Sequence, residues 1–447
     1  MPAKGPSDCK QNGVESRDNQ IFRQYGFGQL RQTGLRERVL TMGSAIAPHK
    51  DVTIHLIGKD ALLLQAERGD LIRLNPAAAY IWCCLQDGQG PEEIISDYSS
   101  EYCRSKEHAR NEIDLTLKNF SDHGLLAGGA DEAVESRPEP GQTPLPRRST
   151  PPERRGPQHS LQILGTKFHV YYPSADLRDA VEEVMAQFSE PDKSCDVVMD
   201  VVRRGGGYGI LADGQEIESG RSVDELIPQL KSALLVTAIN RIEFGAYFHS
   251  AVLSVGDELL LLPGPAGSGK TCLTLALSLN GFGYVSDETA LLEMKTMHIR
   301  AVPLSPCLKS GAWDLISTMY PALSKIKPYQ RVDGKEVKYL PVPAWRGNGS
   351  RDTARPARWM VFPTYSPEQP TELRRVEHID ALQRLVQDCN AWRADLTPQM
   401  VDQIIEWIYG VTCYELCFSS LDEAVNEIAS ICKDGQFGHS NKRLHLL

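Results

Sequence analysis

A glycine-rich octet with a terminal Lys-Thr pair is the strongest chemical pattern in the sequence. Its glycines let backbone N–H groups turn toward an anionic phosphate, and the helix that follows adds the positive end of its dipole. Lys270, on a loop we expect to face solvent, would reach the terminal phosphates of a nucleotide, and Thr271 would offer its hydroxyl to Mg²⁺. ATP and Mg²⁺ are thus the predicted cofactors. The predicted nucleotide-binding residues are Gly264-Pro265-Ala266-Gly267-Ser268-Gly269-Lys270-Thr271, in the pattern GxxxxGK[ST], and Cys272.

Two adjacent carboxylates, Asp287 and Glu288, end a short apolar stretch that begins at Gly281. If this strand lies beside the one that feeds the glycine-rich loop, both acids face the γ-phosphate and its metal. One could then hold Mg²⁺ while the other accepts the proton of an attacking hydroxyl. The alternative is a solvated turn after a strand. His249 lies just before the strand that feeds the loop, and a single His is more often structural than catalytic.

The elements around the loop alternate between strand and helix patterns. The apolar run 259–262 predicts a strand directly before the octet, and the residues from Cys272 onward favour a helix. Upstream we predict strands at 161–171 and 196–202 and helices at 177–188 and 223–240. Downstream, helices at 401–409 and 421–432 lie on either side of 413–418. The sequence therefore predicts an α/β domain over residues 159–447.

A smaller unit is predicted over residues 50–127. Three short strand-like runs, 52–56, 61–64 and 71–74, are separated by turn residues and form an antiparallel meander. After it the period becomes helical, with Asn75 as the cap and Pro76 in the first turn. A second helix begins at Pro91, and a third contains Ile113 and Leu117 and closes at Gly124. The unit is a winged-helix-like β3α3 domain.

Two segments have the composition of loosely ordered chain. Residues 1–49 are polar and show no sustained period, so we interpret them as an N-terminal arm. Residues 128–158 are rich in Gly, Pro, Ser, Glu and Arg, which predicts a flexible linker between the two folded parts.

Composition narrows the class of protein. The chain has 447 residues, a net charge of −10 and a hydrophobic fraction of 41%, as expected of a soluble protein with more than one core. The acidic balance argues against nucleic acid as a partner. No apolar run is long enough for a signal peptide or a membrane span, so we expect a cytoplasmic protein without a membrane partner. The eleven cysteines show no zinc-ligand spacing, which favours free buried thiols.

Taken together, the motifs of the larger domain resemble those of the HPr kinase/phosphorylase-like family, related in fold to ATP-type phosphoenolpyruvate carboxykinases. The matching motifs are Phe248-His249-Ser250-Ala251, the octet, Val285-Ser286-Asp287-Glu288 and Pro306-Cys307-Leu308-Lys309. The resemblance implies that Asp287 is the general base and that His249 is functional. The second acid is Glu288 where the family has Asp, and the family's Glu-Ile-Arg-Gly-type signature is not found after Asp287. Since the related kinases form rings, the resemblance allows a homo-oligomer.

The smaller domain resembles PqqD-type peptide-recognition domains. The matching residues are Leu74-Asn75-Pro76-Ala77-Ala78-Ala79-Tyr80-Ile81-Trp82, Glu92-Glu93-Ile94, and the stretch from Ile113 to Leu126. In such domains the leader of a precursor peptide adds a strand to the third strand and packs on the third helix. The resemblance therefore places a peptide-binding site at Leu71, Ile72, Arg73, Leu74, Ile113 and Leu117.

The combination predicts an ATP-dependent kinase that phosphorylates a Ser or Thr hydroxyl on a ribosomally synthesised precursor peptide during natural-product maturation. Lys270, Thr271 and Glu288 would bind phosphate and metal, and Asp287 would take the hydroxyl proton. Two alternatives stay open. One is a kinase for a small molecule such as free serine, and the other is a nucleotide-gated adaptor that presents the precursor without catalysis.

Overall fold

The computed structural model describes residues 46–127 except 59, 67 and 69, 156–341 except 191–193, 353–392 except 388, and 396–432. The predicted arm 1–49, apart from its last four residues, lies outside the described residues, as does the predicted linker 128–158 apart from its last three. The described chain divides into two compact units. Among the described residues, the first contains 46–127 and 396–402, and the second contains the rest from 156 onward.

The first unit is built on a three-stranded antiparallel sheet, as predicted. Its strands are β1 (Val52–Ile57), β2 (Asp60–Gln65) and β3 (Asp70–Leu74), in the order β1-β2-β3. Each strand pairs with the next in sequence, because the turns between them are too short for any other connection. β2 lies in the centre, and all six of its residues are buried.

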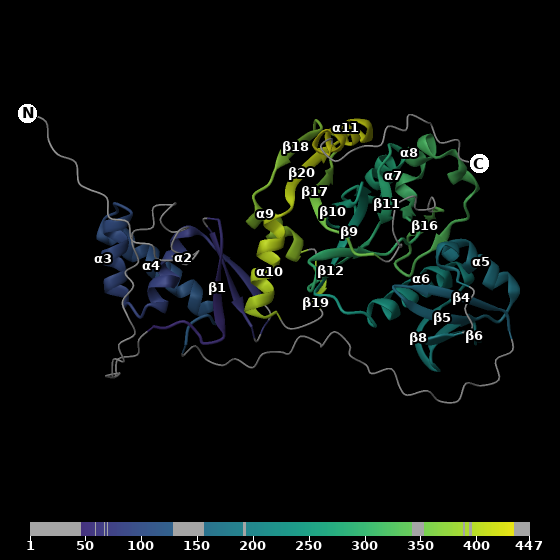
Figure 1. The fold of residues 1–447 in the computed structure, drawn as a ribbon, viewed down its shortest axis with the longest axis horizontal. Helices are drawn as coiled ribbons and strands as arrows, with labels where there is room; N and C mark the ends of the chain where they lie inside the picture. The colour runs from purple at the N-terminus through teal and green to yellow at the C-terminus, as the bar shows by residue number, and fades with distance from the viewer. Residues whose placement is uncertain are drawn as a thin grey trace, which may run out of the picture. The chain divides into compact units, whose positions relative to one another are not determined.

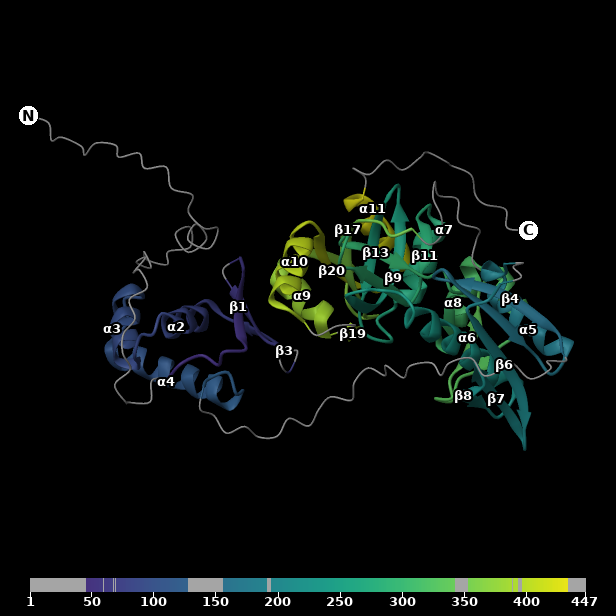
Figure 2. The same cartoon turned by 60° about the horizontal axis from the view of Figure 1, so that its bottom comes forward.

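Three helices follow, and the views in Figures 1 and 2 place them on one side of this sheet: α2 (Pro76–Gln86), α3 (Pro91–Glu101) and α4 (Lys106–Asp122). The Asn75 side chain accepts a hydrogen bond of 2.8 Å from the Ala78 N–H, which confirms the predicted cap. Gly124 follows α4 with φ at 66°, a left-handed conformation suited to a residue without Cβ. Trp82 and Phe120 meet edge to face in the core, with ring centroids 5.2 Å apart.

The second unit begins with a five-stranded sheet. Its strands, in spatial order, are β4 (Gln158–Ile163), β5 (Thr166–Tyr171), β6 (Val197–Arg204), β7 (Gly207–Ala212) and β8 (Gln215–Gly220). The single strand predicted over 161–171 is wrong, because the chain reverses at Leu164 and Gly165, which both have positive φ. The sequence analysis also did not predict β7 and β8.

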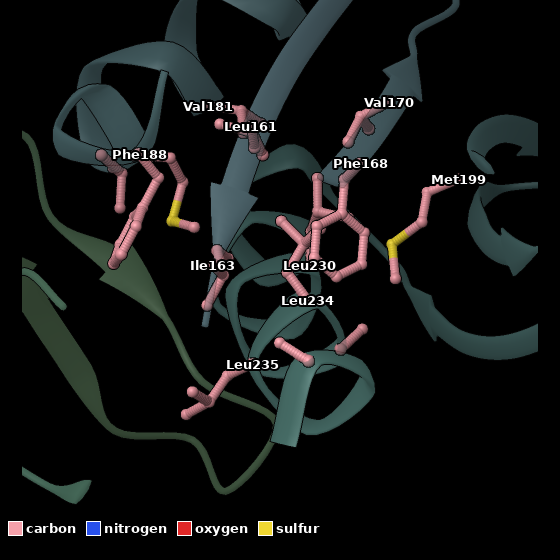
Figure 3. Close-up of a cluster of buried hydrophobic side chains, with 14 of the residues drawn as sticks. Leu161, Ile163, Phe168, Val170, Val181, Phe188, Met199, Leu230, Leu234 and Leu235 are labelled. Carbon is pink, nitrogen blue, oxygen red and sulfur yellow. The ribbon is translucent and has the colours of Figure 1, made fainter. Parts of the chain in front are cut away.

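Helices α5 (Ala175–Met185) and α6 (Val223–Ile239) pack on this sheet, in agreement with the two predicted helices. Figure 3 shows the resulting core, in which side chains of β4, β5 and β6 meet those of α5 and α6. Phe168, Leu230 and Leu234 are fully buried there. This core holds α6 firmly in place, and α6 carries one of the site residues described below.

A nine-stranded sheet forms the centre of the second unit. The main path runs β13-β12-β9-β10-β17-β20-β18, and β11 and β19 pair with β9. The bounds are β9 (Ala246–Val255), β10 (Glu258–Pro263), β11 (Gly283–Ser286), β12 (Thr289–Glu293), β13 (His298–Ala301), β17 (Ala357–Tyr365), β18 (Glu372–Arg375), β19 (Cys389–Trp392) and β20 (Thr412–Phe418). Strands β10, β17 and β20 are mutually parallel.

Helices and a small sheet complete this unit. The helices are α7 (Lys270–Leu279), α8 (Trp313–Met319), α9 (His378–Gln387), α10 (Pro398–Tyr409) and α11 (Leu421–Ile431). Both C-terminal helices that the sequence predicts are confirmed as α10 and α11, and the segment between them is β20. The small sheet has the order β14-β16-β15, formed by β14 (Cys307–Lys309), β16 (Glu336–Tyr339) and β15 (Tyr329–Gln330). None of the described helices has the length and apolar character needed to cross a membrane.

Candidate functional site

The glycine-rich loop, residues 264–269, connects β10 to α7. Gly264, Gly267 and Gly269 have φ angles of 151°, 95° and 91°, which L-residues with a side chain rarely adopt. Gly269 is the N-cap of α7, so the positive end of the helix dipole faces the loop. The predicted order of strand, loop and helix is therefore present.

Lys270 is folded back onto this loop. It is only 6% exposed, and its ammonium group donates hydrogen bonds to the carbonyl oxygens of Gly264 and, at 2.8 Å, of Pro265. The loop faces solvent as expected, since Pro265, Ala266 and Gly267 are exposed, but the Lys270 side chain is buried and the loop's own carbonyls compensate its charge.

The acidic pair occupies an interruption between two strands. Ser286, at the end of β11, pairs with Val252, and Thr289, at the start of β12, pairs with His249, so Asp287 and Glu288 fall between two ladders on β9. The condition set in the sequence analysis, that this strand lies beside β10, is not met, because β9 lies between them. The acids still reach the loop because β9 ends its pairing with β10 at the same level, where Ser250 faces Pro263.

Asp287 makes the contact that joins the acidic pair to the loop. The Thr271 hydroxyl donates to Asp287 Oδ2 at 3.3 Å, and the Cys307 backbone N–H donates to the same oxygen at 3.2 Å. The other oxygen, Oδ1, is buried and accepts no hydrogen bond from the described residues. Burial, with the charge of Glu288 as the second cause, raises the pKa of Asp287 to about 6. A carboxyl group with such a pKa is a stronger base than an ordinary Asp.

Glu288 lies in a different electrostatic environment. Burial by itself would raise its pKa, but the charges of nearby basic groups outweigh burial and lower it. These groups are Lys231, His249, Arg331 and Lys309. The pKa values of the two neighbouring acids therefore shift in opposite directions, so Glu288 is held ionised and Asp287 is closer to neutrality. This is the pattern of a pair with two different roles.

His249 lies inside β9, where it faces Thr289, and it is half-buried. Sequence reasoning put it before the strand that feeds the loop, and the structure agrees, because β9 precedes β10. Its charge, when the ring is protonated, acts on Glu288. It is thus one of the groups gathered around the acidic pair.

Three groups of this site were missed by sequence reasoning: the Cys307 N–H, Lys231, and Arg331, whose charge helps to lower the pKa of Glu288. Cys307 lies in the motif 306–309 named above, but that motif did not indicate that its backbone N–H donates to Asp287. Lys231 lies on α6, 7% exposed, with its ammonium 4.0 Å from Glu288 Oε2. A signal for it was present: Ile227 and Leu234, one turn away on either side, are buried apolar residues, so Lys231 stands on the apolar face of its helix.

The residues predicted to bind a peptide are divided between an edge and a core. β3 pairs only with β2 among the described residues, so one of its edges has no strand partner there. Leu71 and Ile72 are half-buried on this strand, and Arg73 is exposed and bonded to Asp60 at 3.0 Å.

The other three predicted peptide-binding residues, Leu74, Ile113 and Leu117, are buried at 4%, 0% and 8% exposure in the hydrophobic core of the first unit. Their side chains are occupied by core contacts.

The arrangement around the loop fits a magnesium nucleotide. Mg²⁺ in proteins is usually held by one or two side-chain oxygens together with phosphate oxygens and waters. The Thr271 hydroxyl and the unbonded Oδ1 of Asp287 are oxygens of this kind, and Glu288 adds an ionised carboxylate. Over the described ranges, no group of three or more His, Cys, Asp and Glu side chains is gathered as a metal site.

Comparison with known proteins identifies one part of the chain. Residues 60–126 match the family model described as Coenzyme PQQ synthesis protein D (PqqD), so the predicted PqqD-like domain is confirmed. No curated protein matches the chain. A solved structure, "TbiB1 in Complex with the TbiA(beta) Leader Peptide", is 26% identical over 19% of this chain and 99% of that chain, with a TM-score of 0.18.

Proposed function

We propose that this protein is an ATP-dependent kinase that phosphorylates a Ser or Thr hydroxyl of a ribosomally synthesised precursor peptide. The observation that carries the proposal is the bond of 3.3 Å between the hydroxyl of Thr271, at the end of the GxxxxGK[ST] pattern, and Asp287. It joins a phosphate-binding loop to a buried acid of raised pKa, and phosphoryl transfer to an alcohol needs both. By the same reasoning we propose an HPr kinase-like fold for residues 159–447.

In the proposed reaction the acceptor oxygen forms a bond to the γ-phosphorus of ATP. The bond from that phosphorus to the β,γ-bridging oxygen breaks, ADP leaves, and Asp287 takes the proton of the acceptor hydroxyl. Mg²⁺, when bound, neutralises charge on the phosphate oxygens. Thr271 and Glu288 would hold it, and His249 would orient the phosphate or Asp287.

Lys270 must change partners for this reaction. Its ammonium leaves the carbonyls of Gly264 and Pro265 and turns to the β- and γ-phosphates, where a charge-assisted bond replaces two bonds to neutral oxygens. The backbone donors of the glycine-rich loop bind the same phosphates, so the lysine acts where the transferred charge develops.

In this proposal the PqqD-like domain selects the substrate. The edge of β3 is suited to strand addition, in which backbone hydrogen bonds give affinity and side-chain contacts give selectivity. Residues 60–126, which match the PqqD model, include this strand. The resemblance to PqqD-type domains implies that a leader peptide adds to the third strand. We therefore propose a leader peptide as the ligand of this edge, with Leu71 and Ile72 as the side chains it meets.

Nucleotide binding can be tested apart from the peptide. Calorimetric titration of the full chain with ATP and Mg²⁺ should give saturable binding with one site. The variant Thr271→Val keeps the shape of the side chain and removes the hydroxyl, so it should bind ATP more weakly in Mg²⁺ and equally well in EDTA. Absence of binding to the wild-type chain would rule out the kinase.

A further inference from the structure

Lys231 is a buried lysine whose hydrogen-bonding capacity is unused within the described structure. It stands on the apolar face of α6 at 7% exposure, between turns that carry Ile227 and Leu234. A buried ammonium group is costly unless its three N–H donors are satisfied. Such a residue in a well-packed helix therefore needs an explanation, since Met or Leu would fill the same space at no such cost.

The contacts of Lys231 leave its donors open. The ammonium lies 4.8 Å from the centroid of the Tyr339 ring and 4.0 Å from Glu288 Oε2. A charge-assisted hydrogen bond between these groups would be about 2.7–2.9 Å long, so the pair with Glu288 is electrostatic only. Lys231 donates no hydrogen bond to any residue in the described ranges. A structural ion pair closed by a hydrogen bond would have a shorter distance between the ammonium nitrogen and the carboxylate oxygen.

The surroundings of Glu288, which lies next to Lys231, are rich in positive charge. Arg331 and Lys309 also act on Glu288, and they come from the β15–β16 connection and from β14, far from α6 in the sequence. Cys307, two residues before Lys309 on the same strand, provides the N–H that Asp287 accepts. The two acids thus face several basic groups that come from separate elements. The surplus of positive charge suits the binding of an anion.

We propose that Lys231 binds an oxyanion, the phosphoryl group on the acceptor side of the site, with Lys309 and Arg331 as neighbouring positive charges. The inference rests on the proposed kinase function and extends it with a second phosphate-binding lysine. Lys270 approaches the nucleotide from the glycine-rich loop, whereas Lys231 approaches from α6 across Glu288. A phosphate monoester oxygen would supply the acceptor that its N–H donors lack.

The test uses the full chain and inorganic phosphate as the probe, in saturating ADP and Mg²⁺ so that the glycine-rich loop is occupied. Phosphate should raise the melting temperature of the wild type in a saturable way. In Lys231→Met, which keeps length and packing, phosphate affinity should fall about ten- to a hundred-fold, the usual scale for a hydrogen bond to a charged group. ADP affinity should stay within about threefold, on the assumption that Lys270 and the loop dominate nucleotide binding.

The matched control is Lys338→Met. Lys338 also lies over an aromatic ring, 4.6 Å from the centroid of Trp313, but its ammonium already donates to the Leu323 carbonyl at 2.9 Å. Its removal should leave phosphate binding unchanged. Should Lys231→Met fail to fold, Lys231→Gln, which is polar and neutral, takes its place.

Two results would overturn the inference: no phosphate effect on the wild type, or the same phosphate affinity in the Lys231 variant as in the wild type. Failure of the kinase proposal has a separate signature, the lack of any ADP effect on the wild type. In that case the phosphate titration without ADP still decides the role of Lys231.

Discussion

At the scale of single residues, the site depends on how one carboxyl group is surrounded. Sequence reasoning identified Asp287 and Glu288 from their position after a strand. It could not assign them different environments, because these come from the Thr271 hydroxyl, the Cys307 N–H and the ammonium of Lys231. Burial then raises the pKa of Asp287, while basic neighbours lower that of Glu288. The two acids are adjacent in the sequence, whereas the groups that set their pKa values come from distant parts of the chain.

Asp287→Asn should keep the structure and remove the base. The amide has the same shape and is neutral, so ADP affinity should change little. Initial rates of phosphoryl transfer should fall roughly a hundredfold or more, the scale expected for loss of a general base. If the variant works within a few fold of the wild type, the proton goes elsewhere, and Glu288 or His249 becomes the candidate.

Lys270→Ala should abolish phosphoryl transfer with the fold retained. The change leaves the Gly264 and Pro265 carbonyls without their donor, but these belong to a loop that water can reach, since Pro265 itself is exposed. Circular dichroism should show the wild-type spectrum, and ATP titration should show weakened binding. A fully active Lys270→Ala chain would contradict the assignment of the loop.

At the scale of elements, strands with a regular pattern were predicted and strands that depend on a partner were not. β1, β2 and β3 are separated by clear turn residues, and the start of α2 is marked by a capping Asn and a Pro in the first turn. β8 is exposed along most of its length, so it shows no buried face for a sequence pattern to reveal. It forms because β7 offers an edge. The β4–β5 reversal was missed because Leu164 adopts a left-handed φ of 51°, which its residue type does not suggest.

The glycine-rich loop allows a matched pair of substitutions. A Cβ at Gly269 would lie 2.8 Å from Phe418 Cζ, whereas a Cβ at Gly267 would meet no atom within 4 Å, and both glycines have left-handed φ. Gly267→Ala should therefore cost only the backbone strain, about 1–3 kcal/mol. Gly269→Ala should cost more, because the Phe418 ring must also move. Chemical denaturation of both variants tests this order, and equal stability would show that the loop relaxes freely.

β4 contains a buried histidine that should make stability depend on pH. His159 is 5% exposed and bonds the Ser189 hydroxyl at 2.8 Å, and burial lowers its pKa. The unfolded chain therefore takes up a proton at a higher pH than the folded chain, and stability is lost as pH falls below about 6.5, the usual pKa of His. His159→Gln cannot titrate, so its denaturation midpoint should fall less between pH 7.5 and 5.5. Parallel losses in both chains would contradict this role.

At the scale of the whole molecule, capture of a peptide and chemistry on it are assigned to different units. The site in the second unit combines α6, β9–β12, β14 and the glycine-rich loop, segments separated by many residues in sequence. The loop, the acidic pair, His249 and residues 306–309 carry local signatures. The approach of Lys231 to Glu288 and the hydrogen bond from the Cys307 N–H to Asp287 depend on the tertiary fold.

Substitution of the β3 edge should impair capture alone. Leu71→Glu places a charge on the proposed peptide-binding strand, and Ile217→Glu is its control, a change at an exposed apolar residue of the edge strand β8. Leu71→Glu should raise the KM for the precursor severalfold, with turnover recovered at high peptide concentration and ADP affinity unchanged, because only the local concentration of substrate is affected.

The most direct test of the central claim is mass spectrometry of a candidate precursor peptide after incubation with the full chain, ATP and Mg²⁺. We predict a gain of phosphate on a Ser or Thr of the peptide, absent with Asp287→Asn and reduced at low peptide concentration with Leu71→Glu. An unmodified precursor, together with phosphate transfer to free serine, would make the protein a small-molecule kinase. An unmodified precursor with no ATP turnover at all would make it an adaptor, and either result contradicts the account.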